Sequence, residues 1–128
     1  MKELSTPSAP PPSGAYSQGI QAGPLIFTAG MGPFDPVTGA VVDGAIEEQT
    51  ARTLLNLRAV LEEGGSSLKE VVKVTVHLQD VNRDFAGFDG VYRSYFEAPY
   101  PVRTTVGSAL VGILIEMDVV AVQSSVPA

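Results

Sequence analysis

The stretch EEQTARTLLNLRAVLEEGGSSLKEVVKVTVHLQD (47–80) contains a helical pattern followed directly by a strand pattern. In its first half one apolar stripe recurs at helical spacing, formed by Ala51, Leu54, Leu57 and Leu61 and widened by Leu55 and Val60. Two glutamates at the start suit the positive end of a helix dipole, and the Gly64-Gly65 pair offers a C-cap. This half therefore predicts a helix that packs one face on a core.

The second half, VVKVTVHLQD (71–80), alternates with the period of a strand. Its apolar row is expected to be Val72, Val74, Val76 and Leu78, and its other row Lys73, Thr75 and His77. We expect the apolar row to meet helices and the second row to face a semi-polar environment.

Three other segments have strand character, and one more has helical character. Apolar and β-branched residues cluster between turn residues in PLIFTAG (24–30), VRTTV (102–106) and LIEMDVVAV (114–122). In NRDFAGFDGVYRSYF (82–96) aromatic residues recur at spacings of three and four, which predicts a second helix despite two internal glycines. The segment 31–44 is rich in Pro, Gly and Asp and predicts turns around at most a short strand.

This order of elements predicts an α+β fold in which two helices pack on one face of a mixed sheet. The other sheet face is then uncovered within one chain, which favours a closed homo-oligomer. We expect one domain over residues 14–128. The Pro-rich residues 1–13 are expected to be a flexible segment, as a tail or an edge covering.

Charge and composition exclude several function classes. The chain has 128 residues, a formal net charge of -6 and no cysteine. Nucleic-acid binding depends largely on Lys and Arg that neutralise phosphates, and this acidic chain has only scattered Lys and Arg. We therefore expect no nucleic-acid partner. The N-terminus has no apolar signal region, and no segment approaches the length of a membrane span. We expect a cytoplasmic protein without membrane contacts.

Charged residues inside strand patterns are the candidates for chemistry. Glu116 and Asp118 project from one face of their strand, and Arg103 and Thr105 from one face of theirs. If the intervening residues form a hairpin, Arg103 lies roughly opposite Glu116, but a longer-range pairing or a contact between subunits would serve equally. One interpretation is a partly buried ion pair. The other is a clamp for a substrate carboxylate, because a guanidinium matches that group in two parallel hydrogen bonds.

Other motifs add little support for alternative chemistry. The single histidine, His77, has no partners at metal-ligand spacing, so we expect no metal and interpret it as a packing or hydrogen-bonding residue. Serine-nucleophile and phosphate-loop patterns are absent from the sequence. Tyr16 in GAYSQG (14–19) is either a core residue or part of a pocket rim. The glycines of TAGMG (28–32) form a turn or let a ligand approach the backbone.

Taken in order, several segments together resemble the RidA/YjgF family of enamine/imine deaminases: GAYSQG, IFTAGMGPFDPVTG, the stretch from residue 47 to 85, VYRSYF, PVRTTVG and ILIEMDVVAV. The resemblance runs from about residue 14 to 122. It implies a chorismate-mutase-like subunit and a homotrimer, with the three sheets forming a central β-barrel. It further implies helices on the outside and a site in each cleft between subunits.

The resemblance also implies hydrolysis of 2-aminoacrylate-type enamines and imines to 2-keto acids and ammonia, without metal or cofactor. Arg103 would clamp the substrate carboxylate, and Glu116 would hold or activate the attacking water. Tyr16 would line the pocket, while backbone groups of Gly30 and Thr105 would complete the hydrogen bonding.

This chain departs from the common deaminase pattern near the expected site. Met31 stands where Gln is frequent, Asp89 where Asn is common, and Thr105 where Cys is frequent. An apolar Met31 and an acidic Asp89 in the cleft would alter substrate preference.

Two alternative functions are compatible with the resemblance. A non-catalytic member that binds or senses a small carboxylate would need Arg103 but not Glu116. A ribonuclease activity is attached to some relatives by name, and the acidic charge of this chain disfavours it.

Overall fold

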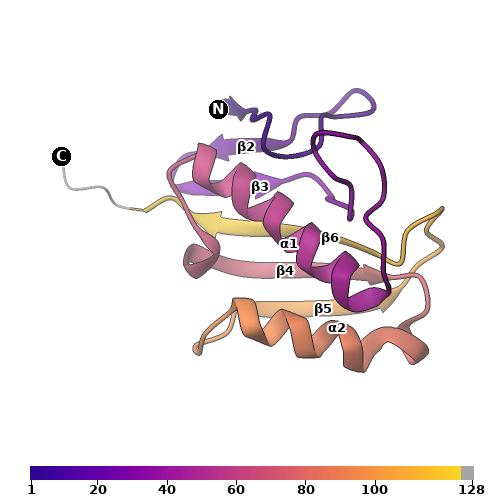
Figure 1. The fold of residues 1–128 in the computed structure, drawn as a ribbon. Helices are drawn as coiled ribbons and strands as arrows, with labels where there is room; N and C mark the ends of the chain where they lie inside the picture. Colours follow the sequence, from indigo (N-terminus) through magenta and orange to yellow (C-terminus); the bar gives the residue numbers. More distant parts are fainter. Residues whose placement is uncertain (125–128) are drawn as a thin grey trace.

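A computed structural model describes residues 1–124 of the chain. The elements in chain order are β1 (Lys2–Leu4), β2 (Gly19–Ala22), β3 (Leu25–Thr28), α1 (Ile46–Glu63), a short 3-10 helix (Leu68–Glu70), β4 (Val71–Leu78), α2 (Val81–Tyr95), β5 (Val102–Gly107) and β6 (Ile115–Val122). The strands form one mixed sheet in the order β1-β2-β3-β6-β4-β5. Both long helices lie on the same face of this sheet (Figure 1). The expected α+β architecture is therefore confirmed.

The core lies between the helices and one row of side chains from the central strands. Along β6 every second residue is buried, from Ile115 to Ala121, and on β4 the buried residues include Val74, Val76 and Leu78. From α1 the core receives residues that are completely shielded from solvent, Leu54, Leu57, Val60 and Leu61. This is the apolar stripe of the sequence, so helical periodicity predicted which face of α1 is buried.

Val72 was expected in the buried apolar row of β4, and this expectation is wrong. Val72 is 44% exposed, whereas Val71 is buried. A register shift in the β4–β6 pairing falls between Val71 and Lys73, so the extra residue interrupts the alternation there. Beyond the irregularity, Lys73, Thr75 and His77 lie in the row opposite to the core, as expected.

Strand pairing decides where the charged strand residues lie. Strand β5 pairs in parallel with β4, and β4 pairs antiparallel with β6, so β4 separates β5 from β6. The hairpin considered between residues 103 and 116 does not form. Instead α2 is the crossover that joins β4 to β5, the usual connection between parallel neighbours.

The N-terminal stretch covers one edge of the sheet. Strand β1 pairs with β2, and Leu4 and Ala9 are buried. The side chain of Gln18 donates to the carbonyls of Thr6, Ala9 and Pro10 at 3.1, 3.2 and 2.8 Å and accepts the Thr6 N–H at 2.7 Å. Of the two roles expected for this stretch, its contacts are those of an edge covering.

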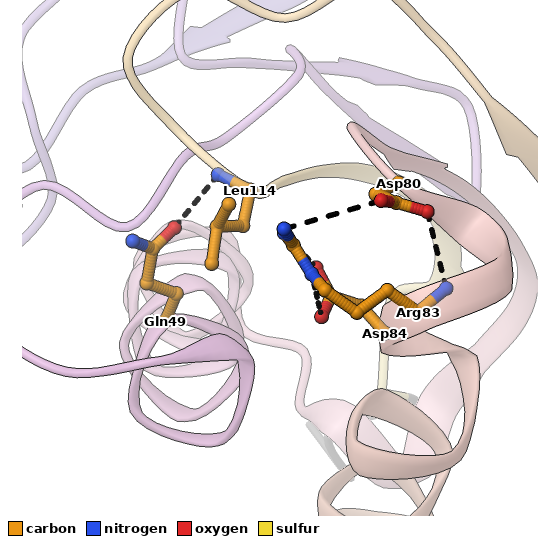
Figure 2. A network of polar contacts seen from close by, with 5 residues as sticks. All are labelled: Gln49, Asp80, Arg83, Asp84 and Leu114. Atoms are coloured by element: carbon orange, nitrogen blue, oxygen red, sulfur yellow. Dashed lines mark hydrogen bonds and ion pairs between the residues drawn. The ribbon is translucent and has the colours of Figure 1, made fainter.

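Polar contacts fix the positions of the helix ends (Figure 2). The buried amide of Gln49 on α1 accepts the N–H of Leu114, just before β6, at 2.8 Å. Asp80 caps α2 by accepting the N–H of Arg83 at 3.1 Å, and the Arg83 guanidinium makes two hydrogen bonds to Asp84 at 3.0 and 2.9 Å. These contacts satisfy a free backbone donor and pair the charges in the first turn of α2.

The second face of the sheet carries no helix within the described residues. It exposes apolar side chains that include Phe27, Val102 and Val106. No helix in residues 1–124 combines the length and apolar character that a membrane span requires.

Candidate active site

The pairing register places Arg103 and Glu116 on opposite faces of the sheet. Arg103 is the β5 neighbour of the buried Val74, so its side chain points toward the helices. Glu116 is the β6 neighbour of His77, so its side chain points to the other face. The interpretation of Arg103 as an ion-pair partner of Glu116 or Asp118 is therefore wrong within one chain.

Arg103 is held by an acid and aromatic rings on α2. Its Nη1 donates to Oδ1 of Asp89 at 2.8 Å. Its guanidinium carbon lies 4.6 Å from the ring centre of Tyr92, 5.2 Å from Phe88 and 5.7 Å from Phe85. Rings at these distances attract a cation and exclude water from one side of it. The side chain is left 23% exposed, and its charge is partly desolvated.

Asp89 bridges two arginines. Its second oxygen, Oδ2, accepts from Nη2 of Arg93 at 2.7 Å. The hydrogen bond from Arg103, followed by that from Arg93, lowers the pKa of Asp89, so the carboxylate is charged at neutral pH. Two guanidinium groups and one carboxylate leave this cluster one positive charge, which favours an anionic ligand.

The cluster opens into a hollow of about 380 Å³ lined by Asp89, Tyr92, Arg93, Tyr100, Pro101 and Arg103. We call it the arginine hollow. The Tyr92 hydroxyl is buried and has no hydrogen-bond partner among the described residues. Burial raises the pKa of Tyr92, so the phenol stays protonated.

A second hollow, of about 510 Å³, surrounds Glu116, and we call it the glutamate hollow. A Cβ added to Gly30 would lie 3.0 Å from the carboxyl carbon and from Oε2 of Glu116, so the two residues are in close approach. Met31 lies beside them, with its backbone N–H donating to the Met117 carbonyl at 2.7 Å. The remaining lining residues are Pro10, Pro11, Ser13, Tyr16, Gly32, Phe34, Gly39, Ala109, Leu110, Val111 and Ile113.

Tyr16 belongs to the rim of the glutamate hollow. It is 49% exposed, which excludes the core role that the sequence left open. Its hydroxyl accepts the Ser13 N–H at 3.1 Å and lies 3.2 Å from the Ser13 hydroxyl. The Pro-rich stretch thus positions this phenol at the hollow.

The sequence-derived site residues therefore separate into two groups. Asp89 and Arg103 line the arginine hollow, and Tyr16, Gly30, Met31 and Glu116 line the glutamate hollow. Thr105 lines neither hollow, but it is half-buried on the same face of β5 as Arg103.

Sequence reasoning missed Arg93, Tyr92 and Tyr100, which complete the arginine hollow. The available signal was the spacing of four between Asp89 and Arg93, which predicts a contact on a helix. Sequence spacing alone gives no indication that the same acid also reaches Arg103.

Two other titratable residues lie on the open face near Glu116. Nδ1 of His77 lies 2.7 Å from the Ser108 hydroxyl, which confirms its expected hydrogen-bonding role. Burial raises the pKa of Asp118, and the nearby His77 and Lys73 oppose this shift. Within residues 1–124 no three His, Cys, Asp or Glu side chains gather as metal ligands would.

Comparison with known proteins identifies the family. Residues 6–123 match the family described as Endoribonuclease L-PSP. The chain is 49% identical over 118 residues to a RutC family protein of Pyrococcus abyssi, covering 91% of this chain and 92% of that one. The chain belongs to the RidA/YjgF family.

Further RidA/YjgF relatives have more specific names. The chain is 36% identical over 106 residues to a 2-iminobutanoate/2-iminopropanoate deaminase of Dermatophagoides farinae, covering 83% of this chain and 82% of that one. The crystal structure of RidA from the Antarctic bacterium Psychrobacter superposes with a TM-score of 0.90 at 31% identity, covering 95% and 99% of the two chains. The crystal structure of Escherichia coli TdcF with bound serine superposes with a TM-score of 0.89 at 32% identity, covering 97% of this chain and 100% of that one. These likenesses support an imine deaminase role at the level of the family.

Proposed function

We propose that this RidA/YjgF protein hydrolyses 2-aminoacrylate-type enamines and their imines to 2-keto acids and ammonia. The observation that carries the proposal is the setting of Arg103, a partly shielded guanidinium in a hollow with one excess positive charge. Only part of the guanidinium is occupied by Asp89, so other N–H groups remain for a substrate carboxylate. The deaminase relative supports the same chemistry.

The proposed assembly is a homotrimer in which each site joins two chains. Arg103 and Glu116 lie on opposite faces of one sheet, so a single chain does not bring them to one substrate. The open sheet face exposes apolar residues that a neighbouring chain would cover, as in a central β-barrel. In this arrangement the arginine hollow of one chain faces the glutamate hollow of the next.

The mechanism needs no nucleophilic side chain. Protonation of the enamine carbon gives an iminium carboxylate, whose electrophilic carbon is attacked by water. The carbinolamine then expels ammonia, and the net reaction converts one iminium carboxylate and one water to one 2-keto acid and one ammonium ion. Arg103 orients the carboxylate, and Glu116 holds the water and accepts its proton. Tyr16 and Met31 line the pocket, and backbone groups of Gly30 and Thr105 complete the hydrogen bonding.

The test is the hydrolysis of 2-aminoacrylate generated in situ, measured as keto-acid release above the spontaneous rate. We expect Arg103→Ala to lower kcat/KM at least about 100-fold, because it removes charge-assisted hydrogen bonds to the substrate. Arg58→Ala is the matched control, since Arg58 is an exposed arginine on α1. Equal rates for the wild type and Arg103→Ala would contradict the proposal.

The second candidate is a non-catalytic protein that binds a small amino or keto acid. The TdcF structure contains bound serine, which favours this candidate for a chain of the same fold. Such a protein would show no hydrolysis even as the wild type, and it would keep its ligand affinity when Glu116 is replaced by Ala.

A further inference from the structure

The acidic residue inside the arginine hollow is the feature that the proposed function leaves unexplained. Asp89 is only 19% exposed, and its two oxygens bond to different arginines at 2.8 and 2.7 Å. Asp89 positions Arg103, but its fixed negative charge also repels the carboxylate of a ligand bound to the same guanidinium.

We propose that Asp89 selects ligands that carry a cationic nitrogen next to their carboxylate and disfavours plain anions, including the 2-keto acid product. This inference rests on the proposed function, because it concerns the ligand that Arg103 binds. It assigns Asp89 the role of a specificity-determining residue.

The argument starts from where a ligand carboxylate must lie. Nη1 of Arg103 is engaged by Asp89, so a ligand carboxylate bonds to the remaining N–H groups of the same guanidinium. That guanidinium then separates two carboxylates by no more than its own width. Tyr92 and Phe88 shield it from water, which strengthens the repulsion between the two negative charges.

A cationic nitrogen removes that repulsion. In an α-iminium or α-ammonium carboxylate the nitrogen is two bonds from the carboxylate carbon, so it reaches the neighbourhood of Asp89 while the carboxylate stays on Arg103. The nitrogen then donates to the Asp89 carboxylate, and this hydrogen bond is strong because both partners are charged. A 2-keto acid has a carbonyl oxygen at this position and offers Asp89 no donor.

Arg93 keeps the acid compatible with carboxylate binding. It bonds to Oδ2 of Asp89 from the solvent side, with 67% of its own side chain exposed. Its charge leaves the cluster positive, so Asp89 changes which carboxylate binds and does not abolish binding.

The reaction itself removes the positive charge of the ligand that lies next to Asp89. Hydrolysis of the iminium carboxylate releases the nitrogen as ammonium and leaves a keto acid with one negative charge. The ligand therefore loses its favourable contact with Asp89 when the C–N bond breaks. We expect the product to leave more readily than it would from a site with a neutral residue at this position.

The experiment compares L-alanine with L-lactate, which share a shape and differ in an ammonium or a hydroxyl group. Each is titrated by calorimetry into the wild type and Asp89→Asn, with pyruvate as the product probe. We expect Asp89→Asn to tighten L-lactate and pyruvate binding about tenfold and to leave L-alanine binding unchanged or weaker. Asp43→Asn is the control, because it removes the same charge from an exposed loop. We expect it to change the affinity for neither L-alanine nor L-lactate.

Two results would overturn the inference. If Asp89→Asn changes the affinities for L-alanine and L-lactate equally, Asp89 acts only through net charge. If the variant binds L-lactate more weakly, Asp89 only orients Arg103. Circular dichroism of Asp89→Asn verifies that a shift is not caused by unfolding. Failure of the proposed function is distinct, because it appears as an absence of 2-aminoacrylate hydrolysis by the wild type, which the binding titrations do not measure.

Discussion

The arginine hollow is walled by aromatic rings and contains two arginines that both contact Asp89. The glutamate hollow is lined mostly by glycines, prolines and aliphatic side chains, and Glu116 is its only acid among the described residues. The first environment suits the recognition of a fixed ionic group. The second suits a carboxylate that must take up and release a proton. Under the proposed function, the arginine hollow binds the ligand carboxylate and the glutamate hollow supplies the base.

The largest expected effect is a loss of kcat without a loss of ligand binding, when the proposed base Glu116 is replaced. Glu116→Gln keeps the size of the side chain and removes its ability to accept a proton. We expect kcat to fall by about 10²–10⁴-fold, the usual contribution of a positioned base, while L-alanine binding changes little. The measurement is steady-state 2-aminoacrylate hydrolysis beside calorimetric titration of the same preparation.

Mixing two inactive variants tests whether the hollows act across chains. Refolding Glu116→Gln together with Arg103→Ala in equal amounts should restore activity at about one quarter of the sites, because each interface draws one residue from each chain. Each variant refolded alone is the control. Activity that stays at the level of the separate variants would contradict the shared site.

A smaller effect is expected when Gly30 is changed. In Gly30→Ala the new methyl carbon would meet the Glu116 carboxyl group at 3.0 Å, so the carboxylate must shift by a few tenths of an ångström. We expect a loss of about tenfold in kcat with L-alanine binding retained, since a displaced base transfers protons less efficiently. Gly90→Ala is the control, because its added carbon meets nothing within 4 Å. Equal activity for both alanine variants would mean that the position of Glu116 is not critical.

The smallest effect concerns stability on the open sheet face. Burial raises the pKa of Asp118, so its charged form is disfavoured in the folded protein. The destabilising contribution is absent below the ordinary aspartate pKa of about 4 and appears as pH rises through the raised value. We expect Asp118→Asn to raise Tm by about 2 °C at pH 7 and to change it little at pH 4, measured by calorimetry. A lower Tm at pH 7 would mean that Lys73 and His77 stabilise the charged acid by more than burial destabilises it.

Periodicity predicted both long helices and the strands β3, β4, β5 and β6, but it did not predict the short strands β1 and β2. The stripe on α1 and the alternation along β6 are local patterns, and both bury the residues that the sequence indicates. The irregularity at Val72 was not predictable in the same way, because a register shift depends on the partner strand. Hydrophobicity gives no information on such an extra residue.

The site was predicted less completely because it depends on pairing between distant segments. The sequence identified Arg103 as an unusual strand residue, but the choice between a hairpin and a parallel crossover depends on long-range pairing. The crossover brings Asp89, fourteen positions earlier, onto the guanidinium. The contact is favoured by the direction in which α2 returns over the sheet, a property of three-dimensional packing.

The crossover from β4 through α2 to β5 has a consequence for protein engineering. The arginine hollow and the rings that shield Arg103 are encoded by the continuous segment from Phe85 to Arg103, whereas the glutamate hollow draws on residues between Pro10 and Glu116. Exchanging a single short cassette between relatives would therefore transplant ligand recognition while leaving the residues around the proposed base in place. A library confined to that cassette would explore substrate preference on an otherwise constant scaffold.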